Sequence, residues 1–241
     1  MNRCEKCGKP TEREITVFGQ KRIVSCMCDC EAKEYDMLKE GFRRMEEEID
    51  RRHRKASGIP DREYAEATFD NAEDSAVIRT AKRYAESFDG KTGMILYGPV
   101  GTGKTFAAAC IANHLIDKGK KVLLTNMSRV EDGVWEDRQG YIASMNVNDL
   151  LILDDFGTER STEYVQEIVQ EVIDSRYRSG KAIIITTNLT GEQLKAPDDV
   201  RKQRVFSRIY EMCVPVKVDG TDRRKQSLKK NYEEKKEVLG L

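Results

Sequence analysis

Eight residues, from Gly98 to Thr105, have the residue types and the spacing of a site for a nucleotide phosphate. They read Gly-Pro-Val-Gly-Thr-Gly-Lys-Thr and match the pattern G-x-x-x-x-G-K-[ST]. An apolar run at 94–97 precedes them and a helical pattern at 106–116 follows, which is the context that this pattern requires. Glycines let successive backbone N–H groups converge on phosphate oxygens, and the following helix adds its free first-turn amides.

Two side chains of this loop have chemical roles of their own. Lys104 is expected to reach the β- and γ-phosphates, and the Thr105 hydroxyl is expected to coordinate Mg²⁺. A glycine-rich turn with an incidental lysine is the alternative, and the strand and helix patterns around the loop argue against it. The predicted nucleotide-binding residues here are Gly98, Pro99, Val100, Gly101, Thr102, Gly103, Lys104, Thr105 and Phe106.

Two adjacent acids follow another apolar run. The segment LLILDDFG, at 150–157, contains Asp154 and Asp155. A magnesium–nucleotide site needs an acid at the carboxyl end of a neighbouring strand, so Asp154 is predicted to hold Mg²⁺ and Asp155 to polarise the attacking water. The acid pair, with no guanine-specifying N-K-x-D pattern in the sequence, favours ATP over GTP. The alternative is that the acids only cap the next turn.

A third apolar run, at 182–187, also ends in polar residues. Asn188 is predicted to hydrogen-bond the attacking water or the γ-phosphate, and Thr187 is the second candidate. The alternative is an asparagine that only forms the turn after a strand. Together, the three strand ends predict a catalytic set of Lys104, Asp154, Asp155 and Asn188.

The strongest charge asymmetry of the chain lies near its end. Residues 201–230 contain ten Lys and Arg and three acids, an excess of seven. Three explanations remain open: a nucleic-acid face, an arginine that completes an ATP site in the same or a neighbouring subunit, or a solvated surface. Trp135, in a polar segment, is expected either to stack on a base or to anchor its loop.

Five cysteines lie within the first thirty residues. Cys4 and Cys7 have the spacing of a zinc knuckle, and Cys26, Cys28 and Cys30 follow. Four thiolates around Zn²⁺, at about 2.3 Å, can hold a module that is too small for its own core. One thiol is spare, so the second pair is Cys28 with Cys30, or Cys26 with one of them. Redox-active cysteines are the alternative.

The chain is expected to have three zones. Residues 1–35 form a zinc-binding module with a hairpin that turns at Phe18-Gly19. Residues 36–70 form a charged helical linker, broken near Gly58–Pro60. Residues 71–241 form the nucleotide-binding domain.

The pattern of this third zone predicts an α/β domain. Continuously apolar runs indicate strands that are buried on both faces, hence a parallel sheet. A fifth run, at 213–218, carries Pro215, which suits an edge strand. Helical patterns lie between the runs, and the clearest begins near Val165 and ends at Gly180. The four buried runs are 94–97, 121–126, 150–154 and 182–187.

The amino-acid composition indicates where in the cell the protein is found, but the overall charge does not indicate what it binds. Of 241 residues, 42 are Lys or Arg and 42 are Asp or Glu, so the formal net charge is zero. The first residues lack the apolar stretch of a secretory signal, and no window approaches the roughly 18 apolar residues that span a bilayer. A cytoplasmic location without membrane contact is the expectation.

These motifs together resemble a known family. The phosphate loop, LLILDDFG, IIITTNL, SRI and GTDRR occur in this order, with SGIPDREYAEATFDN upstream and the cysteines first. This arrangement resembles the DnaC/DnaI-type replicative helicase loaders and, more distantly, the IstB-type transposition ATPases. Both groups are AAA+ proteins. The resemblance covers nearly the whole chain.

The resemblance implies a fold and an activity. It implies an AAA+ P-loop fold with strand order 5-1-4-3-2, and slow, partner-stimulated ATP hydrolysis at a subunit interface. It also implies binding to a hexameric replicative DNA helicase, which is delivered onto single-stranded DNA, and self-association with ATP or the partner. The cysteine module would contact the helicase. An IstB-like transposase helper that binds duplex DNA is one alternative, and a nucleic-acid adaptor with a purely structural nucleotide site is another.

The resemblance also implies further site residues. Arg208, in SRI, would be the arginine finger that reaches a neighbour's ATP, and Phe69 would lie near the adenine. Arg224 would contact the nucleotide in cis. The family usually has a serine and an apolar residue before that arginine, whereas Asp222 and Arg223 stand here. Arg223 is therefore the alternative to Arg224.

Overall fold

The computed structural model describes residues 2–135, 137–157, 162–196 and 199–220, with residues 222 and 236. The chain divides into two compact units, Met1–Arg52 and His53–Leu241. Helix α1 (Asp29–Gly58) runs from the first unit into the second and ends where the sequence predicted a break. The domain boundaries expected at residues 35 and 70 remain a prediction.

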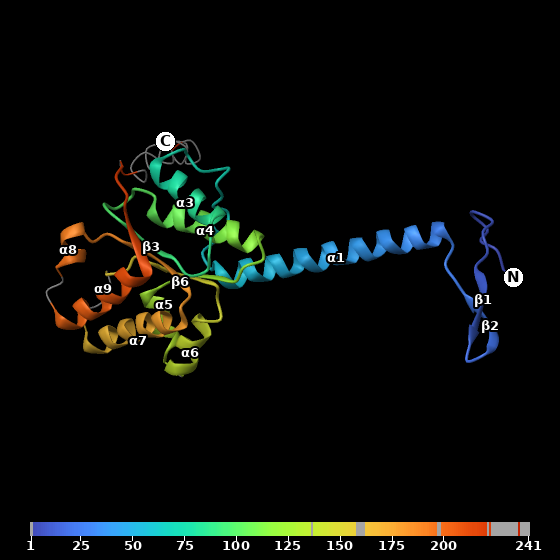
Figure 1. The fold of residues 1–241 in the computed structure, drawn as a ribbon. Coiled ribbons are helices and arrows are strands. Elements are labelled where there is room, and N and C mark those ends of the chain that lie inside the picture. The colour runs from blue at the N-terminus through green and yellow to red at the C-terminus, as the bar shows by residue number, and fades with distance from the viewer. Residues whose placement is uncertain are drawn as a thin grey trace. The chain divides into compact units, whose positions relative to one another are not determined.

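The first unit contains a β-hairpin. Strands β1 (Glu12–Val17) and β2 (Gln20–Ser25) pair antiparallel, and the two-residue turn between them is Phe18-Gly19. Both turn residues have positive φ, 49° and 76°, which matches the twist of the flanking strands. The predicted hairpin and its turn are thus confirmed (Figure 1).

A five-stranded parallel sheet forms the centre of the second unit, within the part of the chain that the structure describes. Its strand order is β4-β5-β6-β3-β7, and this is the expected order 5-1-4-3-2 read from the opposite edge. Strand β7, which carries Pro215, lies at the edge as predicted. The strands are β3 (Gly93–Tyr97), β4 (Val122–Asn126), β5 (Leu150–Asp154), β6 (Ala182–Thr187) and β7 (Cys213–Lys217).

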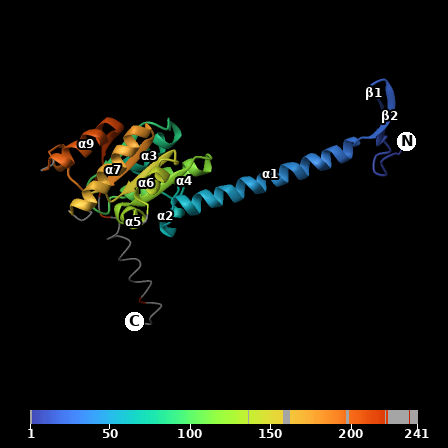
Figure 2. The same cartoon turned by 90° about the horizontal axis from the view of Figure 1, so that it is seen from below.

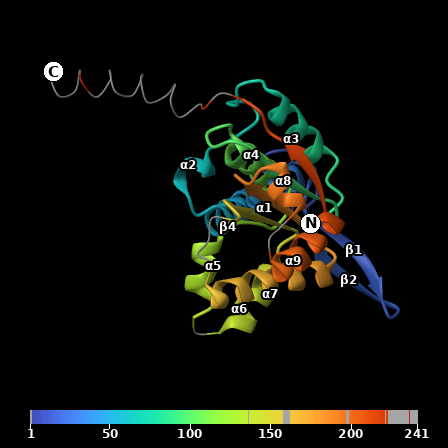
Figure 3. The same cartoon turned by 90° about the vertical axis from the view of Figure 1, so that its left-hand side faces the viewer.

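Helices cover both faces of this sheet, as Figures 1 and 3 show. One core cluster joins α3 (Ala76–Glu86) and α4 (Lys104–Asp117) to one face, and the other joins α7 (Glu163–Ser179) and α9 (Val200–Met212) to the opposite face. Figure 2 looks onto the α7 and α9 layer. Successive strand residues point to alternate clusters, which explains why the strands read as unbroken apolar runs.

Helix α4 directly follows the phosphate loop. Four alanines favour its helical conformation, and nearly every residue from 107 to 116 is buried between the sheet and α3. The phosphate loop is therefore held between a central strand and a fully packed helix. Shorter helices complete the unit: α2 (Arg62–Ala65), α5 (Met127–Gly133), α6 (Arg138–Met145) and α8 (Gly191–Lys195).

Among the residues that the structure describes, no helix has both the length and the apolar character needed to cross a membrane.

Candidate nucleotide-binding site and cysteine cluster

The phosphate loop has the backbone geometry that anion binding requires. Gly98, Gly101 and Gly103 all have positive φ, and α4 begins at Lys104. The Lys104 side chain is buried beside the loop, where its Nζ donates to the carbonyl oxygens of Gly98, at 2.9 Å, and Pro99, at 2.8 Å. The loop therefore carries a buried cation at the start of a helix, and both features stabilise phosphate oxygens.

The segment after β7 supplies a second reason for two of these glycines. A Cβ on Gly98 would lie 2.2 Å from the carbonyl oxygen of Val218, and one on Gly101 would lie 2.0 Å from Oδ1 of Asp222. The N–H of Val218 also donates to the carbonyl oxygen of Tyr97, at 2.8 Å. The loop is thus packed directly against the chain that leaves the edge strand.

The two acids lie at the carboxyl end of β5, as predicted. Asp154 is its last residue, and Asp155 follows with φ 52°, a left-handed conformation that is uncommon for non-glycine residues. Both depend on Thr186, a fully buried residue of the neighbouring strand β6. Its hydroxyl donates to Oδ1 of Asp154, at 2.6 Å, and accepts from the backbone N–H of Asp155, at 3.0 Å. Sequence reasoning missed Thr186.

The environment of Asp154 places it beside the loop threonine. Burial raises the pKa of the Asp154 carboxyl, hydrogen bonds from Thr186 and Thr105 lower it, and the charge of Asp155 raises it. The hydrogen bond from Thr105 brings together the two residues that were predicted to coordinate Mg²⁺. Hydroxyl and carboxylate oxygens are ligands that Mg²⁺ prefers, so this donor set fits the metal.

Asn188 connects the loop to the second acid. Its Oδ1 accepts from Nζ of Lys104, at 2.8 Å, and its Nδ2 lies 3.5 Å from Oδ1 of Asp155. The hydroxyl of Thr187 instead donates to the carbonyl oxygen of Phe156, at 2.6 Å. The geometry therefore favours Asn188 over Thr187 as the residue that faces a nucleotide.

The other predicted nucleotide-binding residues differ in their surroundings. The hydroxyl of Thr102 donates to the carbonyl oxygen of Pro99, at 2.9 Å, whereas Val100 is exposed. Phe106 and Phe69 both pack against the α3–α4 core. The Phe69 ring lies edge-on to the His114 ring, with 5.8 Å between the ring centroids. His114 is on the same helix as Lys104 but almost three turns further along. Its expected place near the adenine remains a prediction.

Arg208, the expected finger, is held within its own subunit. It forms an ion pair with Asp174 of α7, and its guanidinium lies 5.7 Å from the ring centroid of Tyr177. Arg208 and Asp174 are both largely buried. Arg223 and Arg224 lie outside the described residues. Trp135, in contrast, is 82% exposed, which fits a contact surface better than an anchor.

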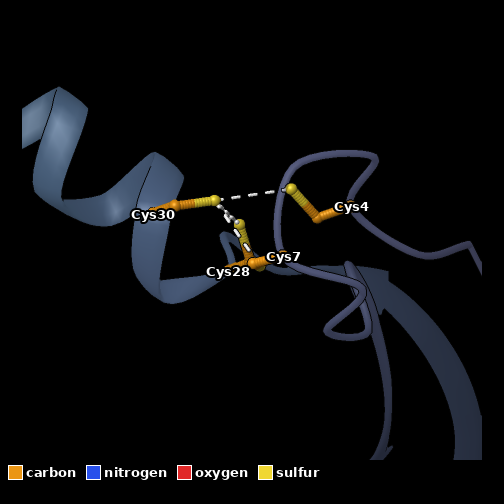
Figure 4. A group of neighbouring side chains, drawn as sticks. All are labelled: Cys4, Cys7, Cys28 and Cys30. Atoms are coloured by element: carbon orange, nitrogen blue, oxygen red, sulfur yellow. Dashed lines mark hydrogen bonds between the residues drawn. The ribbon is translucent and has the colours of Figure 1, made fainter.

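Four of the five N-terminal cysteines converge. The Sγ atoms of Cys4, Cys7, Cys28 and Cys30 all lie within 4.8 Å of one another (Figure 4). Hydrogen bonds, first from the backbone N–H of Cys7, lower the pKa of the Cys4 thiol to about 7. Such a set of four thiols fits a tetrahedral zinc ion. Cys26 lies outside the group, with its Sγ 3.8 Å from the carbonyl oxygen of Pro10.

The comparisons with known proteins agree with this geometry. A family model described as IstB-like ATP binding protein matches residues 32–231. The replicative helicase loader DnaI of Bacillus subtilis (strain 168) is 29% identical over 161 residues, which are 59% of this chain and 50% of that protein. The replicative helicase loader DnaC of Escherichia coli (strain K12) is 31% identical over 127 residues, 48% of this chain and 51% of that protein.

A crystal structure of DnaI has a TM-score of 0.59 at 21% identity and covers 70% of this chain and 98% of that chain. At this identity the likeness shows the fold alone. The matched segments span about half the length of the two curated relatives.

Proposed function

The chain belongs to the family of IstB-like ATP-binding proteins, and on this premise we propose that it is an ATPase that helps to place a hexameric replicative DNA helicase on single-stranded DNA. The observation that carries the ATPase assignment is the connection from Lys104 through Asn188 to Asp155. It joins the phosphate loop to the residue that would act on the attacking water. The loading role is supported by the similarity to two proteins named replicative helicase loaders.

Each residue of the site has a distinct task in this proposal. Bound Mg²⁺–ATP supplies the γ-phosphoryl group and the metal charge. The loop amides and Lys104 would hold the phosphates, and Thr105 and Asp154 would coordinate the metal. Asp155 accepts a proton from the attacking water, and Asn188 orients that water.

Arginines complete the site in the proposed assembly. Arg208 would leave Asp174 and reach the ATP of a neighbouring subunit, where a guanidinium stabilises the charge of the transition state. Arg224, or Arg223 in its place, would contact the nucleotide of its own subunit. An ATPase of this kind is expected to turn over slowly until a partner brings the subunits together.

The cysteine cluster is assigned a structural role. We infer that Cys4, Cys7, Cys28 and Cys30 bind one zinc ion, which holds the N-terminal unit in shape for contact with the helicase. Cys26 is the spare thiol in this assignment.

An ATP-dependent pull-down tests the loading role. The tagged chain is incubated with the purified replicative helicase of the same cell, with and without ATP, and the captured hexamer is identified by mass. Lys104→Ala serves as the control that lacks the phosphate contact. Failure of the wild-type chain to retain the helicase under any condition would remove the loading proposal, while ATP turnover is measured separately.

A transposase-helper role is the second candidate, because the family model that matches is that of the IstB-like proteins. The two roles differ in the nucleic acid that they need. Affinity for single-stranded and duplex DNA, measured with ATP at one stated salt concentration, separates them. A loader should prefer the single strand, and a marked preference for the duplex would favour the transposase helper.

A further inference from the structure

Helix α1 carries a regular stripe of exposed apolar side chains. Tyr35, Leu38, Phe42, Met45 and Ile49 are each between 53% and 61% exposed. They are spaced three, four, three and four residues apart, as are the a and d positions of a heptad, so all five lie on one face of the helix. We name this face the α1 seam. It lies wholly within the first compact unit.

The rest of the helix surface has the character of an ordinary solvated helix. Arg44 donates to Glu40 at 2.6 Å, and Arg51 donates to Glu48 at 2.8 Å, as side chains one turn apart on a helix do. Single exposed apolar residues are common on protein surfaces, but five in register form a contiguous patch. Apolar residues spaced alternately three and four apart pack against a second helix that has the same repeat. The α1 seam is therefore typical of a helix face that another helix covers.

We propose that the α1 seam binds the same seam of a second copy of this chain, as an antiparallel two-stranded coiled coil. In the heptad, Tyr35, Phe42 and Ile49 occupy positions of type a, and Leu38 and Met45 occupy positions of type d. Antiparallel packing places each type-a residue opposite a type-d residue of the second copy. Phe42 then meets Met45 of the second copy at the centre. Tyr35 meets Arg52 of the second copy at each end, where the guanidinium, which donates to Glu48 of its own chain at 2.8 Å, would lie against the tyrosine ring. The contact is isologous, so it closes at two copies.

Charges beside the seam set the direction of the second helix. Lys39 and Glu46 are exposed and occupy e positions, and antiparallel packing places Lys39 opposite Glu46 of the second copy twice in each dimer. A parallel dimer would instead bring Glu31 against Glu31 and Arg52 against Arg52 at the d positions that bound the seam. Like charges in direct opposition are unfavourable, which disfavours the parallel arrangement.

The size of the seam predicts a weak dimer. Five side chains of about 200 Å² each, roughly half exposed on both copies, would bury on the order of 1,000 Å². That area is at the lower end of specific interfaces. The dimer is therefore expected to form reversibly as the protein concentration rises.

Sedimentation equilibrium of the full chain, reduced, zinc-loaded and free of nucleotide, tests the proposal. Phe42→Ser should raise the dimer dissociation constant by roughly tenfold or more, because each dimer loses two central aromatic side chains. Met37→Ser is the matched control. Met37 is 68% exposed on the same helix but lies outside the seam, so its change should be less than about twofold.

A charge swap tests the direction of the second helix. Glu46→Lys should weaken the dimer, because it places Lys39 opposite a lysine, and adding Lys39→Glu should restore it. In a parallel dimer Glu46 would face Gly41 and Glu46→Lys would be silent.

Any one of three results overturns the proposal. The first is a chain that is monomeric at every concentration, which would leave the seam to a different protein. The second is an equal effect of Phe42→Ser and Met37→Ser on the dimer, and the third is a Glu46→Lys variant whose dimer is unchanged. ATP binding by the same variants keeps this inference apart from the proposed function, because the phosphate loop lies in the second compact unit. Loss of the dimer with intact ATP binding supports the seam and leaves the ATPase assignment untouched.

Discussion

The hydroxyl of Thr186 donates a 2.6 Å hydrogen bond to Oδ1 of Asp154. The Thr186 hydroxyl oxygen also accepts a hydrogen bond from the backbone N–H of Asp155, at 3.0 Å, and the φ of 52° at Asp155 needs such support. One buried hydroxyl on β6 therefore orients the carboxylate of one acid and the backbone of the other. It positions both acids from the adjacent strand.

Loss of this hydroxyl should slow hydrolysis more than it weakens ATP binding. Thr186→Val keeps the shape of the side chain, and we expect kcat to fall by roughly tenfold to a hundredfold, because the acids lose their orientation. The dissociation constant for ATP should change little, since the loop is intact. Steady-state kinetics and nucleotide titration measure the two effects. Thr186→Ser, which retains the hydroxyl, should recover most of the rate; equal rates for the two variants would contradict the assignment.

The phosphate loop packs so closely against Val218 that no side chain fits at Gly98. Gly98→Ala would place a Cβ 2.2 Å from a backbone oxygen, so either the loop or the segment after β7 must move. We expect a loss of about 3 kcal/mol in unfolding free energy together with a loss of ATP binding.

Gly119→Ala is the matched control for this change. Gly119 also has positive φ, 80°, but no atom outside its immediate neighbours lies within 4 Å of a Cβ built there. Strain alone should cost about 1 kcal/mol. Denaturant unfolding compares the two variants, and similar losses would show that the contact with Val218 is unimportant.

Zinc removal should affect the first compact unit and spare the second. Most residues of β1 and β2 are exposed, so the hairpin has little core of its own and depends on the four thiols. Cys30→Ser should abolish stoichiometric zinc binding, whereas Cys26→Ser should retain one zinc ion per chain. Metal analysis of both variants decides this. Full zinc content in Cys30→Ser, or its loss in Cys26→Ser, would contradict the proposed ligand set.

Arg176 should matter for stability and not for ATP. It is fully buried and donates to the carbonyl oxygens of Asn148, Asp149 and Ala182, which lie at the start of two sheet strands. Arg176→Met would leave these acceptors buried without a donor, and we expect a loss of about 3 kcal/mol. Arg178→Met, at an exposed position of the same helix, should change the stability by less than about 0.5 kcal/mol. Thermal unfolding at equal protein concentration makes the comparison.

Much of the fold was predictable because buried parallel strands carry an unambiguous signal. Strands β5 and β6 begin and end at the predicted residues, and Pro215 located the edge strand. The phosphate loop was recognisable because its glycines and lysine are adjacent in the sequence. Asp154 and Asp155 were recognisable for the same reason, since a strand pattern ends in them.

Contacts between segments that lie far apart in the sequence could not be predicted. The role of Thr186 depends on the register of β5 and β6, in which Leu153 pairs with Ile185, and sequence periodicity does not set that register. Two threonines at the end of a strand beside two acids were the available signal. The contact between Gly101 and Asp222 joins residues more than a hundred positions apart. The α1 seam was not recognised in the sequence because most residues of the same helix are charged.

Single-turnover hydrolysis of ATP by Asp155→Asn, compared with the wild-type chain, tests the central claim most directly. The change keeps the shape of the side chain and removes the base, so we predict tight Mg²⁺–ATP binding with a rate reduced by roughly a hundredfold. An unchanged rate in Asp155→Asn would contradict the claim that these paired acids perform the hydrolysis, as would a wild-type chain that binds no ATP.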